Sequence, residues 1–312
     1  MMESAAYYAI KINNIIILDK LLLLGHKFNK NINVNKAAGK GYIEILDWFY
    51  DNSIKNPSQV SFCYTYEAIN KAAKKGHVSV LNWFLKLHLK DCKYDILYTS
   101  EAIDQASRYH RIEVLNWFLK QNFLLNMPLL YTPNSLNTYN EKNIFKNHRI
   151  NYQLTLNWWL NSGLELKYLN HAVDFAAHDS NLKVLKWFLK IHLKHGYPFR
   201  HSANAVESVA KNLNIRILDW FFEIYYKYNI PFLYNADVID YASRKAHIDI
   251  LNWFSNHSNE KWLVDKYFPT PAPIPFKYTS AAFSFDEYAD KAYVLRWWAS
   301  KIKEDTKIMP QN

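Results

Sequence analysis

The chain has 312 residues, of which 50% are hydrophobic, 17% aromatic and 21% charged, so it can bury a sizeable core and is not a disordered tail. Its 38 basic residues outnumber its 28 acidic ones, and the net charge of +10 favours acidic partners. The 6 glycines are too few for most chemistry built on Gly-rich phosphate loops. The 2 cysteines, Cys63 and Cys92, are fewer than a disulfide-bonded secreted domain would carry, so we expect a reducing compartment, the cytoplasm.

The N-terminal segment carries two short apolar runs, Ile15–Leu18 and Leu21–Leu24, separated by Asp19 and Lys20. Together they fall short of the roughly 18 uninterrupted apolar residues that a membrane span needs. The chain also lacks the basic start of a signal peptide. We therefore expect neither a membrane span nor a targeting segment.

From this point on, one tetrapeptide recurs along the chain: Leu, then Asp, Asn, Lys or Arg, then Trp, then Phe or Trp. Its tryptophans are Trp48, Trp83, Trp117, Trp158, Trp187, Trp220, Trp253 and Trp297. Most of the spacings lie close to 33 residues, which indicates stacked repeats. The first unit is degenerate, because Lys20 occupies its Trp position.

A pair of small residues precedes the well-aligned Trp by eleven and ten positions: Ala37-Ala38, Ala72-Ala73, Ala106-Ser107, Ala176-Ala177 and Ala242-Ser243. Val209-Ala210 occupies the same place in its repeat, with Ala in the second position only. Small residues allow a neighbouring helix to approach closely. Gly41 and Gly76 stand where a first helix should end in left-handed backbone geometry. The apolar residues that follow have helical spacing and predict a second helix. Each repeat is therefore expected to be two short helices, and the fold an all-α stack of such pairs.

The segment Ala72–Leu81, with its small pair, Gly-His corner and apolar second helix, resembles the ankyrin repeat over roughly residues 1–300. The pattern Ala-(Ile/Val)-Asp followed by Leu-Asn-Trp-Phe, together with an Asn-rich composition, is similar to the ankyrin proteins of giant amoeba-infecting viruses. The resemblance implies an ankyrin-like solenoid of helix-turn-helix repeats of about 33 residues and a protein–protein interaction scaffold. The family's Thr-Pro-Leu-His start is missing throughout, and the corner glycine is replaced by His110, Ser180, Leu213 and Ala246. Leu213 and Ala246 should be strained if that backbone geometry is kept.

One divergent unit is expected near residues 119–160. Its first helix is hard to place, because Pro128 and Pro133 interrupt a segment that is crowded with asparagine. We interpret Met127–Asn147 as a long loop or an irregular helix.

A second interruption is the Pro-rich insertion at residues 269–275. Alternating prolines favour an extended course, so the insertion is interpreted as a rigid linker, with a docking motif for a proline-binding groove as the alternative. Tyr278-Thr279 then echoes Tyr98-Thr99, which predicts a last repeat. Residues 301–312 are expected to form a frayed polar tail.

The eight repeated tryptophans have two interpretations. They could form an aromatic platform that stacks bases or sugars. Their fixed register with Leu and Phe favours structural core positions instead.

No motif in the chain predicts catalysis, and we expect neither enzyme activity, nor a cofactor, nor a metal. His192, His195 and His201 could suggest a metal site, but no Cys or carboxylate lies at a suitable spacing. Asp104, Asp174 and Asp240 recur at one repeat position, where paired carboxylates could do acid–base work. A residue repeated once per unit is more often architectural, so each is expected to bond backbone or a neighbouring loop.

Candidate partner-binding residues follow the small pair of the first helix, on what the resemblance implies is a concave face. They are Lys40, Lys74, Lys75, Arg108, Tyr109, Lys211, Arg244 and Lys245. They could form a basic stripe that steers an acidic protein partner. Alternatively, they could be solvated helix ends, where the helix dipole stabilises cations near the C-terminus. We expect a monomer that binds a protein, a host protein if the viral resemblance holds. The alternative is a binder of nucleic acid or another anionic surface through a basic groove.

Overall fold

The computed structural model describes residues 2–28, 30–137, 148–260, 263, 266, 272–285 and 290–308. Over these residues the regular structure is helical, apart from one isolated bridge between Phe28 and Val60. The predicted all-α class is therefore confirmed. The chain forms two compact units, Met1–Tyr168 and Leu169–Asn312, where the sequence predicts a single stack.

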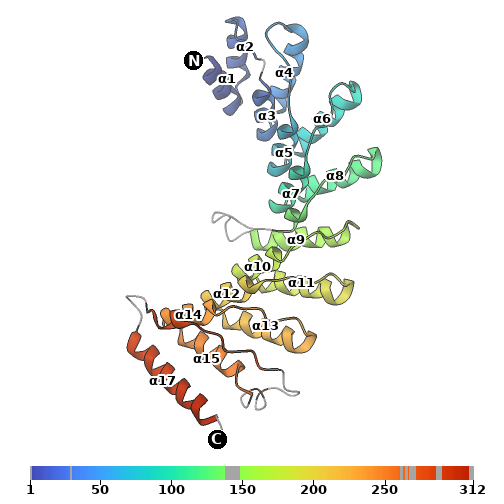
Figure 1. The fold of residues 1–312 in the computed structure, drawn as a ribbon. Coiled ribbons are helices and arrows are strands. Elements are labelled where there is room, and N and C mark those ends of the chain that lie inside the picture. The colour runs from blue at the N-terminus through green and yellow to red at the C-terminus, as the bar shows by residue number, and fades with distance from the viewer. Residues whose placement is uncertain are drawn as a thin grey trace. The chain divides into compact units, whose positions relative to one another are not determined.

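In the first unit, short helices alternate along the chain between the first and second position of each repeat (Figure 1). They are α1 (Met2–Lys11), α2 (Ile15–Leu23), α3 (Asn31–Lys40), α4 (Ile43–Lys55), α5 (Tyr66–Lys75), α6 (Val78–Lys90), α7 (Ser100–Arg108), α8 (Ile112–Leu125), the 3₁₀ turn η1 (Pro133–Ser135) and α9 (His148–Asn161). Successive first helices α1, α3, α5 and α7 pack on one another, and so do the second helices α2, α4, α6 and α8. Each second helix also packs on the first helix of its own repeat.

The second unit repeats this arrangement. Its helices are α10 (His171–His178), α11 (Leu182–His195), α12 (Ala203–Lys211), α13 (Ile215–Tyr228), α14 (Asp237–Arg244), α15 (Ile248–His257), the 3₁₀ turn η2 (Ser280–Phe283) and α17 (Lys291–Ile308). The first helices α10, α12 and α14 pack in series, and η2 packs on α14.

The small pairs allow the first helices to pack closely. Ala37 and Ala38 on α3 and Ala72 and Ala73 on α5 are fully buried. Gly39 adds to this effect, because a Cβ at that position would lie 2.9 Å from the Cβ of Lys71 on α5. A larger side chain in this row would push neighbouring helices apart.

The first helices end in left-handed geometry, as predicted for Gly41 and Gly76, whose φ angles are 83° and 86°. The same geometry is kept where glycine is absent. Leu213 and Ala246 have φ angles of 56° and 58°, and His110 and Ser180 match them at 57° and 53°. The strain expected at Leu213 and Ala246 is therefore present in the fold, since a Cβ disfavours this conformation.

The divergent unit has only a short first helix. After α8 the chain runs without regular structure to Thr132, and the first helix is reduced to η1 (Pro133–Ser135). Of the segment Met127–Asn147, interpreted from sequence as a loop or irregular helix, residues 138–147 lie outside the described part. The last repeat has the same design, because its first helix is reduced to η2.

The C-terminal region differs from expectation in two places. Residues 269–271 of the Pro-rich insertion lie outside the described part, but Ile274 is 4% exposed and its N–H donates to the carbonyl of His257 at 3.1 Å. This end of the insertion therefore packs on the repeat before it and is more than a spacer. The expected frayed tail is helical as far as Ile308, because α17 continues through residues such as Lys301 and Lys303 that favour helix.

Within the described part of the chain, none of the helices has the length and apolar character needed to cross a bilayer.

Candidate functional site

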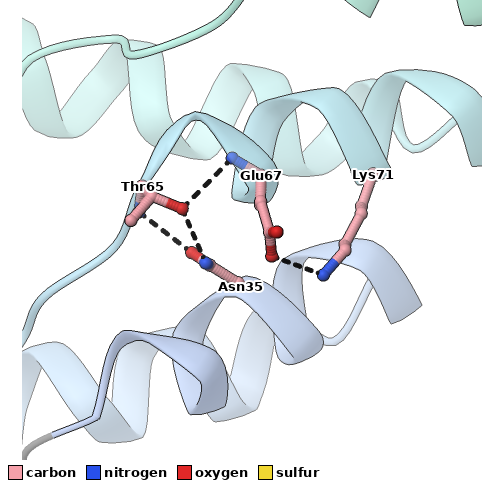
Figure 2. A network of polar contacts seen from close by, with 4 residues as sticks. All are labelled: Asn35, Thr65, Glu67 and Lys71. Atoms are coloured by element: carbon pink, nitrogen blue, oxygen red, sulfur yellow. Dashed lines mark hydrogen bonds and ion pairs between the residues drawn. The ribbon is translucent and has the colours of Figure 1, made fainter. Parts of the chain in front are cut away.

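The first helices are joined by a polar contact that recurs along the stack. In Figure 2, the side-chain amide of Asn35 on α3 donates to the hydroxyl of Thr65 at 2.8 Å and accepts from the Thr65 N–H at 3.0 Å. Thr65 is the N-cap of α5 and accepts from the N–H of Glu67. The buried asparagine thus fixes where the next first helix begins. Asn70 and Thr99 repeat the contact between α5 and α7, at 2.7 Å and 3.2 Å.

Three junctions use aspartate in place of asparagine. Asp104 accepts from the N–H and the hydroxyl of Thr132 at 2.9 Å and 2.6 Å. Asp174 binds Ser202 in the same way, at 2.8 Å and 2.6 Å, and Asp240 binds Thr279, at 2.8 Å and 2.5 Å. The expectation that these aspartates bond a neighbouring loop is therefore confirmed. They connect neighbouring repeats and do not form a carboxylate pair with one another.

Burial has an electrostatic effect on the first of these aspartates. Desolvation raises the pKa of the Asp104 carboxyl above its ordinary value. The hydrogen bonds from Thr132 and the charge of Arg108 oppose that rise without cancelling it. The ionised form of Asp104 therefore carries a cost in the folded chain.

A second contact joins the second helices and uses the repeated tetrapeptide. In six of the eight repeats, the indole N–H of the Trp donates to the Asp or Asn at the position before the Trp site of the preceding repeat. The pairs are Trp48–Asp19 at 2.6 Å, Trp83–Asp47 at 2.7 Å, Trp117–Asn82 at 2.8 Å, Trp158–Asn116 at 2.7 Å, Trp253–Asp219 at 2.7 Å and Trp297–Asn252 at 2.6 Å. The degenerate first unit keeps the acceptor, Asp19, although Lys20 replaces its Trp.

The predicted Trp stripe lies along these junctions with uneven burial. Five of its members are between 4% and 7% exposed: Trp48, Trp117, Trp187, Trp220 and Trp253. Trp83, Trp158 and Trp297 are only half-buried. In their repeats the next aromatic residue, Phe84, Trp159 or Trp298, is the one that is fully packed.

A third contact appears where the second small residue is serine. Ser107 is fully buried, donates to the carbonyl of Ser135 in η1, and accepts the indole N–H of Trp159 at 2.7 Å. Ser243 makes the corresponding bonds to the carbonyl of Ala282 in η2, at 2.6 Å, and to Trp298, at 2.8 Å. The sequence carries a signal for this contact, because the Ala-Ser pairs precede the two Trp-Trp repeats.

A fourth contact ties together the loops that lead into the first helices. Tyr64 donates its hydroxyl to the carbonyl of Asp95 at 2.7 Å, and Tyr98 donates to that of Pro128. Tyr131 donates to the carbonyl of Glu165 at 3.1 Å. In the second unit, the Nε2 of His201 lies 2.8 Å from the carbonyl of Pro231. With the Asx–Thr contacts, these bonds link neighbouring loops in a chain that lacks the Thr-Pro-Leu-His motif.

The predicted basic stripe lies in the last turns and caps of first helices. Lys40, Lys75, Lys211 and Lys245 are exposed, whereas Lys74, Arg108, Tyr109 and Arg244 are partly exposed. Some of these groups already have contacts on the stack. The ammonium of Lys74 lies 4.9 Å from the centre of the Tyr109 ring, and that of Lys211 lies 5.3 Å from the Tyr241 ring. The stripe is therefore partly ordered by cation–π contacts.

A groove of about 630 Å³ lies on the first-helix side, between α5 and α7. Its lining includes Glu67, Lys71 and Lys74 of α5 and Glu101 and Gln105 of α7. Glu67 and Lys71 form an ion pair at 2.7 Å (Figure 2). Lys74 is the other cation in this lining. Sequence reasoning missed Gln105, because nothing in its spacing marks it as a surface residue.

The structure gives the histidines a backbone role. The Nδ1 of His192 lies 2.9 Å from the carbonyl of Tyr197, and the Nε2 of His201 lies near that of Pro231. Among the described residues, no group of three or more His, Cys, Asp or Glu side chains is placed to hold a metal ion.

None of the protein-family models searched matches the chain, and the search of curated proteins also returns no match.

Proposed function

We propose that the chain is an ankyrin-like repeat scaffold that binds a protein partner through the face formed by its first helices. The observation that carries the proposal is the row of cations at the ends of these helices. Lys40 and Lys75 in the first unit, and Lys211 and Lys245 in the second, are exposed beside small pairs that are buried, and Lys211 also pairs with Glu207. Such a row can attract an acidic partner over a long range and speed its encounter.

Three features support the ankyrin-like part of this proposal. The helices come in pairs that pack in series within each unit. The first helices end in left-handed geometry even at Leu213 and Ala246. The junctions between repeats rest on the recurring Asx–Thr and Trp–Asx bonds. A surface held by repeated joints presents its side chains at regular intervals, which suits a binding scaffold.

We further propose that the chain acts as a monomer in the cytoplasm, without a cofactor and without catalysis. If the resemblance to proteins of giant viruses holds, its partners are host proteins. The net charge of +10 also supports a second candidate, a binder of nucleic acid.

The test compares two charge-reversed chains as baits. In one, Lys74, Lys75, Arg244 and Lys245 are changed to Glu. In the matched control, exposed lysines of second helices are changed to Glu: Lys86, Lys120, Lys190 and Lys194. Proteins captured by the wild type and the control but lost from the first variant support the proposal. Equal capture by both variants contradicts it, and capture of nucleic acid that falls steeply with salt favours the second candidate.

A further inference from the structure

Two arginines occupy the same place in two different repeats. Arg108 and Arg244 each follow the sequence Ile-Asp-x-Ala-Ser, at residues 103–107 and 239–243. Each is the last residue of a first helix, α7 or α14, and each is partly exposed. Each is contained in one unit, so the fold builds the same arrangement twice.

The carboxylate that could neutralise each arginine within its helix is used elsewhere. At the corresponding place in α12, Glu207 pairs with Lys211, four residues later, at 2.5 Å. Asp104 instead gives both its oxygens to Thr132, and Asp240 gives both of its oxygens to Thr279. Among the described residues, the arginine four residues after each aspartate therefore makes no direct i,i+4 ion pair, although the charge of Arg108 still lowers the pKa of Asp104.

The following repeat also covers Arg108 and Arg244 less than it covers the lysines at the corresponding positions of other repeats. Lys74 and Lys211 lie under tyrosine rings, Tyr109 and Tyr241, that the following first helix supplies. After α7 and α14, the following first helix is only the turn η1 or η2. In the described part of the chain, the Nε atoms of Arg108 and Arg244 are buried and make no hydrogen bond. A buried donor without an acceptor costs free energy in the folded chain.

We propose that Arg108 and Arg244 are two equivalent receptor positions for an acidic side chain of the protein partner, an inference that rests on the proposed function. A guanidinium group binds a carboxylate through paired N–H groups, which gives both charge neutralisation and orientation. A single arginine suits one monovalent carboxylate. A nucleic acid strand instead needs a continuous track of cations along its phosphates.

The probe is a pair of short peptides, acetyl-Gly-Gly-Glu-Gly-Gly-amide and its Gln counterpart, titrated into the full chain with its arginine Nε–H groups observed by NMR. The Glu peptide should shift the Arg108 and Arg244 signals in a saturable way, and the Gln peptide should not. Two arginines serve as internal controls. The Nε of Arg111 is already bonded to the carbonyl of Lys74 at 3.2 Å, and Arg216 is exposed on a second helix.

Arg108→Lys and Arg244→Lys keep the charge but lose the paired N–H groups. Each substitution should therefore lower the affinity for the Glu peptide about tenfold, at its own position only. Shifts of equal size at Arg216, or none at Arg108 and Arg244, would overturn the proposal. A stronger response to a thymidine hexanucleotide than to the Glu peptide would also overturn it, in favour of phosphate. If the peptide fails but charge reversal at Lys74, Lys75, Arg244 and Lys245 still removes captured proteins, only this inference falls and the proposed function stands.

Discussion

Trp159 donates its indole N–H to the hydroxyl of Ser107, which lies in the small pair of the preceding repeat, at 2.7 Å. The same hydroxyl donates to the carbonyl of Ser135, so one buried serine satisfies two groups of the next repeat. Ser243 and Trp298 repeat the relationship in the other unit at 2.8 Å. A serine in the small pair thus goes with a short 3₁₀ first helix and a double Trp in the repeat that follows.

Ser107→Ala should lower the free energy of unfolding by about 2–4 kcal/mol, because it leaves the Trp159 N–H and the Ser135 carbonyl without their bonds in the core. Urea unfolding followed by circular dichroism measures the loss. The double variant Ser107→Ala with Trp159→Phe should lose less than the sum of the single losses, because phenylalanine has no N–H to leave unpaired. Additive losses would show that the two residues act independently.

The chain's own asparagine junctions predict the effect of changing an aspartate. Asp104→Asn should change the free energy of unfolding very little at pH 7, because Asn35 and Asn70 make the same contact with the next repeat elsewhere in the unit. Asp104→Ala should cost about 1–3 kcal/mol, since the N–H of Thr132 loses its acceptor. Unfolding titrations of both variants compare the two costs, and an equal cost would contradict this account of the joint.

The raised pKa of Asp104 also sets a pH dependence. Between its ordinary value and its folded value, the folded chain binds more protons than the unfolded chain. The contribution of Asp104 to stability therefore falls as pH rises through this interval. Asp104→Asn should remove that fall from the stability profile above pH 4, and an unchanged profile would argue against the assignment.

Strain at the helix corners can be relieved. Ala246→Gly and Leu213→Gly should each raise the free energy of unfolding by about 1 kcal/mol, because both positions have positive φ angles and Leu213 is 50% exposed. Gly76→Ala is the matched reverse change. A Cβ there would lie 3.0 Å from the Cδ of Arg111, so it should destabilise. Thermal melting of the three variants measures these shifts, and a lower melting temperature for Ala246→Gly would contradict the strain.

His257 makes acid weaken the second unit. His257 is 2% exposed, and its Nδ1–H donates to the carbonyl of Trp253 at 2.7 Å. The imidazole also stacks on the indole of Trp253, with 3.9 Å between the ring centroids. Burial lowers the pKa of His257 to about 4. The unfolded chain therefore takes up the proton first as pH falls below about 6.5, and stability is lost between about pH 6.5 and 4, up to roughly 3 kcal/mol. His257→Gln should flatten this part of the profile in urea titrations, and an equally steep profile would exclude His257 as its source.

Much of the fold can be predicted from the sequence because each repeat displays its own pattern. The small pairs and the glycine corners predict the first helices, and the Leu-x-Trp-Phe string predicts the second helices. The short turns η1 and η2 cannot be predicted in this way. Their sequences lack a helical period, and their position depends on bonds from Asp104 and Ser107, or from Asp240 and Ser243, in the repeat before.

The candidate surface is less predictable than the fold. The positions of Lys74 and Arg108 at helix ends follow from the register, but their neighbours do not. Tyr109 covers Lys74 because α7 packs on α5. Arg108 makes no direct ion pair with Asp104 because both oxygens of Asp104 accept from Thr132. Both facts depend on contacts between repeats, which a single repeat does not display.

In the proposed function, cations on the first-helix face recruit an acidic protein. The most direct measurement is the association rate of a captured partner with the wild type, with Lys74→Glu/Lys75→Glu and with the control Lys86→Glu/Lys120→Glu, as a function of salt. The first variant should associate more slowly at low salt while melting normally, and the difference should shrink as salt rises. Equal association rates for the three chains at low salt would contradict the claim.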